Sequence, residues 1–180
     1  MPFAYYDRLS ARDRAIYRAS DATPSLVLPQ AERLHPLVEG LRQALEREDR
    51  LEVEGVTGGL ALGLARHLGL GPVSIQVLAV RPSAKWGELH GLYTRDERRP
   101  PRIQLWVRTA RHRRVVAFRT FLRTLLHEMG HHIDYEHLHL EDSFHTEGFF
   151  KRESSLFRQL VPEAAGSRAQ DSEEPLPGLK

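Results

Sequence analysis

The sequence predicts an α+β fold, with a small, mostly antiparallel sheet between a helical N-terminal part and two C-terminal helices. Two observations lead to this prediction. Three segments of alternating apolar and polar residues follow one another in the middle of the chain, and the segments on either side carry apolar residues at helical spacing. Helices and strands that are segregated along the chain in this way are typical of α+β domains. The 180 residues are enough for one domain with a proper core.

The chain divides into three predicted parts. Residues 1–30 form an N-terminal arm with one short helix, which begins after Ser10, whose hydroxyl can cap it, and ends before Pro24. Residues 31–161 form the main domain. Residues 162–180 are polar and rich in proline, so we expect this tail to be disordered.

Within the main domain, helices are predicted where apolar residues recur every three or four positions, and strands where apolar and polar residues alternate. The segment GLG at residues 69–71 closes the second helix. Loops rich in proline, glycine and charge separate the strands, as is usual between antiparallel strands. The expected helices are residues 31–48, 56–68, 115–136 and 147–160, and the expected strands are residues 74–80, 88–94 and 103–108.

The composition excludes several kinds of site and of protein. The chain has no cysteine, so it has no disulfide, no thiolate metal site and no cysteine nucleophile. No stretch reaches the roughly 18 apolar residues needed to cross a bilayer, and the N-terminus lacks the apolar region of a signal peptide. We therefore expect a cytoplasmic protein that does not insert into a membrane.

Arginines are concentrated in one span of the chain, although the formal net charge is only +2. Such a span can attract an anionic partner such as nucleic acid, but an arginine-rich solvated surface gives the same pattern. The arginines concerned are Arg95, Arg98, Arg99, Arg102, Arg108, Arg111, Arg113 and Arg114.

The segment with the clearest chemistry holds six of the chain's ten histidines. In it, His127, Glu128 and His131 form the pattern HExxH. On a helix, two residues four positions apart differ by about 40° around the axis, so both imidazoles can reach one metal ion from the same face. The carboxylate of Glu128 lies beside them, where it can take a proton from water.

The helix that carries this pattern is amphipathic. Its apolar stripe is expected to pack against the sheet, and the histidines lie on the opposite face, toward a space that other elements must wall. Asp134 lies on that face and can be interpreted in two ways. It either orients the imidazole of a metal ligand or is simply exposed to solvent near the end of the helix. The stripe is Phe118, Leu122, Leu125, Leu126, Met129 and Ile133; the opposite face is Thr120, Thr124, His127, His131 and Asp134.

A catalytic zinc site normally has three protein ligands, so a third ligand is needed. His137 has the spacing of the metzincins, but Asp134 stands where their glycine makes a turn, and no Met-turn follows. Glu153 lies in the last predicted helix. His145 directly precedes that helix. The residues alone leave these three candidates open.

The segments LLHEMGHHID and SFHTEGFFKRESSL together resemble the SprT-like zinc metallopeptidases, small zincins in which a histidine near the start of the next helix completes the site. The resemblance covers roughly residues 70–160. It implies a minimal zincin-like fold for the main domain and a Zn²⁺ cofactor. It also implies that His127, His131 and His145 are the ligands and that Glu128 is the catalytic base.

This interpretation predicts hydrolysis of a peptide or protein substrate. We expect the substrate to lie extended along an edge strand near residues 103–108. Many SprT-like proteins carry a C-terminal zinc ribbon, which a chain without cysteine cannot form. Two alternatives stay open: a non-catalytic zinc-binding regulatory protein, and a nucleic-acid-associated SprT/Spartan-like protease that uses the arginine-rich span.

Overall fold

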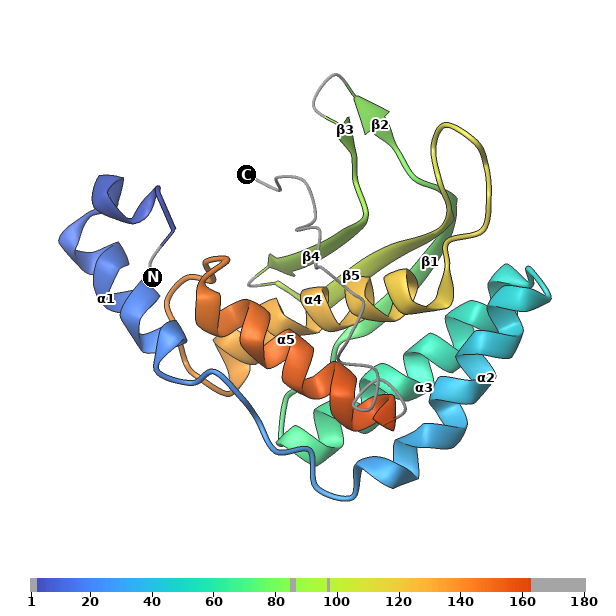
Figure 1. Cartoon of the computed structure of the whole chain (residues 1–180), viewed down its shortest axis with the longest axis horizontal. Coiled ribbons are helices and arrows are strands. Elements are labelled where there is room, and N and C mark those ends of the chain that lie inside the picture. Colours follow the sequence, from blue (N-terminus) through green and yellow to red (C-terminus); the bar gives the residue numbers. More distant parts are fainter. Residues whose placement is uncertain (1–2, 85–86, 97, 163–180) are drawn as a thin grey trace.

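The computed structural model describes residues 3–84, 87–96 and 98–162, and over these residues the chain has the predicted α+β fold (Figure 1). A small sheet packs on helix α4 (Phe118–Glu136), and α5 (Glu147–Leu160) lies alongside α4. The pair α2 (His35–Glu46) and α3 (Arg50–Leu68) flanks this unit, with α3 against strand β1 (Ser74–Val80), and α1 (Ala11–Asp21) contacts α5.

The N-terminal part is helical, as expected. α1 (Ala11–Asp21) begins after Ser10, whose hydroxyl oxygen accepts a hydrogen bond from the amide of Asp13 at 3.1 Å, so the predicted cap is confirmed. In α2 (His35–Glu46), Pro36 lies in the first turn, where its missing N–H leaves no helical bond unmade. Short 3-10 turns at Tyr6–Arg8 and Ala31–Leu34 precede α1 and α2.

Helix α3 (Arg50–Leu68) is longer than predicted. It begins at Arg50 instead of residue 56, because the carboxylate of Asp49 accepts hydrogen bonds from two backbone amides of the first turn at 3.0 and 3.1 Å. It ends as predicted at Gly69, which has a positive φ of 66° and suits a residue without a side chain.

The main sheet has three strands in the order β1-β5-β4. They are β1 (Ser74–Val80), β4 (Gly91–Asp96) and β5 (Arg99–Arg108). β4 and β5 form an antiparallel hairpin, whereas β5 pairs with β1 in parallel, which the long connection between them permits. The predicted strand 88–94 is divided, because its start belongs to a separate antiparallel ribbon of β2 (Ser83–Ala84) and β3 (Gly87–Glu88).

β5 is the central strand and has partners on both sides. The prediction that residues 103–108 form an edge strand is therefore wrong. Among the described residues, β4 pairs only with β5, so β4 is the sheet edge next to α4. The alternation of residues in a strand reports which face is buried but not which strands lie beside it, and this is why the sequence did not reveal the order.

The sheet packs on the apolar stripe of α4 (Phe118–Glu136). Ile103 and Leu105 of β5 are fully buried in one core with Leu122 and Leu125 of α4. Shared burial of these side chains fixes how α4 is turned about its own axis, and with it the direction of the histidines.

The limits of the last two helices follow from local contacts. α4 starts at Phe118 rather than Val115, because the chain before it still pairs with β5: the amide of Val116 donates to the carbonyl of Val107 at 2.8 Å. α5 (Glu147–Leu160) has the predicted limits, and the hydroxyl oxygen of Thr146 caps it.

The arginine-rich span does not form one surface. β5 has ten residues, which makes it about 30 Å long. The β4–β5 hairpin and the loop before α4 lie at opposite ends of β5 (Figure 1). Each of them carries exposed arginines. Nucleic-acid binding through this span stays a prediction. The first group is Arg95, Arg98, Arg99 and Arg102, and the second is Arg111, Arg113 and Arg114; Arg108 is partly buried.

The remaining expectations concern the two ends of the chain and the membrane. No helix among the described residues is long and apolar enough to cross a membrane. The predicted tail lies, except for Pro162, outside the described residues. The division into arm, main domain and tail stays a prediction.

Candidate metal centre

Three histidines from two segments converge on one point. His127 and His131 project from α4, and His145 lies in the loop just before α5. The Nε2 atom of His145 is 3.0 Å from Nε2 of His127 and 3.2 Å from Nε2 of His131. One ligand atom from each of the three lies within 4.8 Å of the others. These histidines are therefore close enough together to hold a metal ion.

The imidazole of His127 is oriented from behind by Glu153 on α5. Its Nδ1 atom lies 3.3 Å from a carboxylate oxygen of Glu153, which accepts a hydrogen bond, so Nδ1 carries the proton. The lone pair of His127 is then on Nε2, the atom that faces the other two histidines. Glu153, one of the candidate third ligands, thus lies on the far side of the ring from the trio. Arg123 stands 3.5 Å from its other oxygen.

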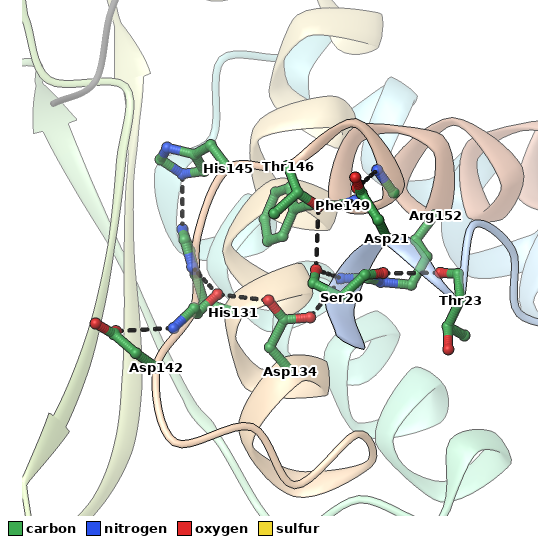
Figure 2. Close-up of polar contacts among 12 residues, drawn as sticks. Ser20, Asp21, Thr23, His131, Asp134, Asp142, His145, Thr146, Phe149 and Arg152 are labelled. Atoms are coloured by element: carbon green, nitrogen blue, oxygen red, sulfur yellow. Dashed lines mark hydrogen bonds and ion pairs between the residues drawn. The ribbon is translucent and has the colours of Figure 1, made fainter. Parts of the chain in front are cut away.

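The imidazole of His131 is oriented through a hydroxyl group. Its Nδ1 atom lies 2.8 Å from Oγ of Ser143, and that hydroxyl donates its proton to Asp134 at 2.7 Å. Oγ therefore accepts from Nδ1–H, and the lone pair of His131 is also on Nε2. Arg152 donates to the other oxygen of Asp134 at 2.5 Å (Figure 2). Because Asp134 is fully buried, its interpretation as an exposed residue is wrong.

The trio suits a metal ion better than it suits hydrogen bonds among the rings. The Nε2 atoms of His127 and His131 both present lone pairs toward Nε2 of His145. A single proton on Nε2 of His145 can be donated to only one of these two atoms. Imidazole nitrogens around a tetrahedral zinc ion lie about 3.3 Å apart, since each Zn–N bond is about 2.0–2.1 Å. Burial, together with the neighbouring imidazoles, lowers the pKa of His131 to about 3, which keeps it in the neutral form that binds metals.

A phenylalanine forms the floor of the centre. The ring of Phe149 is buried, and its centroid lies 5.0 Å from those of His127 and His131 and 5.3 Å from that of His145. Phe149 can approach because residue 130 is glycine: a Cβ atom on Gly130 would lie 2.7 Å from the ring. The glycine inside the HExxH segment thus sets how closely α5 packs on α4.

Glu128 lies beside the trio, enclosed by the edge strand. Its side chain is 3% exposed, and burial raises its pKa to about 7, although His127 and the backbone amide of Tyr93 oppose the rise. A Cβ atom on Gly91 would lie 2.8 Å from Cγ of Glu128 and equally close to Cγ2 of Thr124. The backbone of β4 therefore touches Glu128 directly.

The other histidines of the segment lie elsewhere. His132 is fully buried; its Nδ1 is 3.1 Å from the hydroxyl of Tyr93 and its Nε2 3.0 Å from the carbonyl of Gly71, so it ties α4 to β4 and to the chain before β1. His137 and His139 are exposed and outside the trio. The metzincin-like placement of His137 as the third ligand therefore has no support in the geometry.

Several residues that contribute to the centre could not be identified from the sequence. Tyr93 stacks on His131 at 6.2 Å between ring centroids, and it comes from a strand that carries no motif. Ser143 stands two residues before His145, which is the one local hint that it belongs to the site. The others act across the fold: they are Gly91, Phe149 and Arg152.

A comparison with models of known protein families, with curated proteins and with solved structures found no match. The chemistry of the centre is therefore inferred from its own residues.

Proposed function

We propose that this chain is a zinc-dependent metallopeptidase similar to the SprT-like enzymes, in which His127, His131 and His145 bind the metal and Glu128 is the catalytic base. The observation that carries the proposal is the convergence of three Nε2 atoms beside a buried glutamate. Three imidazoles without a thiolate are a common donor set for zinc.

When bound, zinc acts as a Lewis acid on the peptide carbonyl and lowers the pKa of water to about 7. Residues of the chain orient the metal ligands and transfer the protons. Glu153 and Ser143 hold the imidazoles of His127 and His131 with Nε2 free of its proton. Glu128 takes a proton from the attacking water and gives it to the leaving amine. In the metal-free protein burial raises the pKa of Glu128 to about 7, and the positive charge of a bound zinc ion would lower it from that value, toward the carboxylate form that accepts the proton of water.

The substrate is proposed to bind along β4. An edge strand offers unpaired backbone groups to which an extended peptide can add as a further strand. The inward-facing residues of β4 reach the centre: Gly91 touches Glu128, and Tyr93 stacks on His131. A peptide paired with the free edge of β4 therefore runs past the metal ligands.

The first test is metal content together with hydrolysis of a general protein substrate. We expect about one zinc ion per chain in the wild type and in the matched control His137→Ala, which removes an exposed histidine of the same segment. His145→Ala should lose the metal. Glu128→Gln should keep the metal but lose casein hydrolysis by about 100- to 10,000-fold.

Two results would overturn the proposal. A wild-type chain that binds no metal would remove the site itself. Metal binding without any Glu128-dependent hydrolysis would instead favour a zinc-binding regulatory protein.

A further inference from the structure

We propose that the N-terminal segment, residues 3–23, is a positioning element for the metal ligands His131 and His145, and that it reaches His131 through Arg152. This inference rests on the metal site proposed above but not on peptide hydrolysis.

Arg152 joins the end of α1 to α4. It lies on α5 and is only 1% exposed. Its Nη1 donates to the carbonyls of Ser20 and Thr23 at 2.6 and 2.8 Å, and its Nη2 donates to the hydroxyl of Ser20 at 2.9 Å and to Asp134 at 2.5 Å (Figure 2). Carbonyl groups at the end of a helix lack partners within it and attract a cation. The end of α1 thus supplies three of the four acceptors that hold this guanidinium.

Arg152 influences the orientation of the metal ligand His131 through two intervening side chains. Arg152 fixes one oxygen of Asp134, the other oxygen accepts from Ser143, and Ser143 accepts from Nδ1 of His131. Each step is a single hydrogen bond of 2.5–2.8 Å between groups that are buried or partly buried. A shift of the guanidinium toward solvent would therefore release the ring of His131 from its orientation.

The third ligand is held by the same segment more directly. His145 lies in a loop, where no helix fixes its backbone. The hydroxyl of Tyr5 donates to the carbonyl of His145 at 2.7 Å. Thr146, the residue after His145, is held as well, because its hydroxyl lies 3.1 Å from the hydroxyl of Ser20.

The start of α5 is clamped as well. The amide of Gly148 donates to a carboxylate oxygen of Asp21 at 2.6 Å. A Cβ atom at Gly148 would lie 2.6 Å from the backbone of Ser20 and Asp21, so glycine is needed for this close approach. The loop that carries His145 is therefore fixed between contacts to Tyr5, Ser20 and Asp21.

The test compares zinc affinity, measured by competition with a chelator, across full-length variants. Ser143→Ala, which breaks the connection to His131, should weaken zinc binding about 10- to 100-fold. Tyr5→Phe and Ser20→Ala, which each remove a hydroxyl of the N-terminal segment, should weaken it about 2- to 10-fold. The matched control Tyr6→Phe removes a hydroxyl of the same segment that bonds Arg18 and contacts neither the ligands nor Arg152, and Ser25→Ala removes a hydroxyl just beyond the segment; both should bind zinc like the wild type.

A second measurement separates positioning from stability. The visible absorption of the Co²⁺-substituted protein reports the geometry around the metal, and it should change in Tyr5→Phe and Ser20→Ala but not in the controls. Wild-type affinity and wild-type spectra in both variants would overturn the inference, even if Ser143→Ala weakens binding. Absence of metal from the wild type would instead remove the proposed site itself.

Discussion

Replacing Gly91 by alanine tests whether the edge strand touches Glu128, the proposed catalytic base. The new Cβ atom would lie 2.8 Å from Cγ of Glu128 and 2.8 Å from Cγ2 of Thr124, and it would also overlap the carboxylate. Both side chains belong to α4 and are buried, so neither can move without shifting its neighbours. Gly91 does not have a positive φ, so the substitution causes no backbone strain and its effect comes from these contacts.

Two opposing effects determine how much Gly91→Ala changes the free energy of unfolding. Overpacking of this kind typically costs about 1–3 kcal/mol. Replacing glycine by alanine also restricts the unfolded chain, which returns about 0.4–1 kcal/mol. The variant should therefore be less stable by up to roughly 2.5 kcal/mol. Displacement of the Glu128 carboxylate by about 1 Å should lower the rate of hydrolysis about 100-fold.

Urea denaturation of the metal-free protein measures the stability, and casein hydrolysis measures the rate. Gly55→Ala is the matched control, because a Cβ atom on this helical glycine meets nothing within 4 Å; it should stabilise the protein by about 0.5–1 kcal/mol. In a Glu128→Ala background, Gly91→Ala should cost less than in the wild type. A Gly91→Ala variant as stable and as active as the wild type would refute the contact.

Three further predictions follow from buried groups. Arg152→Met leaves the carboxylate of Asp134 buried without its partner and should cost about 3–5 kcal/mol in urea denaturation; a loss below about 1 kcal/mol would contradict the burial of this pair. Gly130→Ala brings a Cβ atom to 2.7 Å from the ring of Phe149 and should be less stable than the helical control Gly55→Ala by about 1–3 kcal/mol, with equal stability of the two variants as the contrary result. In the metal-free protein, the pKa of Glu128 is about 7 against an ordinary value of 4.5, so its contribution to stability is full below pH 4.5 and is lost as the pH rises through 7. Glu128→Gln stays neutral and should therefore exceed the wild type at pH 8 by on the order of 3 kcal/mol, but not at pH 4; equal stabilities at both pH values would rule out the raised pKa.

The sequence determined most of the helices and strands, and the part of the metal centre that lies on α4. The helical spacing of apolar residues, the cap at Ser10 and the glycine at 69 are local properties, and α1, α5 and the end of α3 lie where these predict. The placement of His127, Glu128 and His131 together follows from the helix period alone. These predictions hold because each depends on residues within a few positions of one another.

Tertiary structure decided the rest. It made β5 central and β4 the edge, it put His145 rather than Glu153 or His137 next to Nε2 of the other histidines, and it buried Asp134 under Arg152. The contacts responsible join separate elements: β1 pairs with β5, Asp134 of α4 pairs with Arg152 of α5, and the N-terminal segment contacts Arg152 and His145. A periodic pattern reports which face of an element is buried, whereas the partner on that face depends on how the whole chain packs.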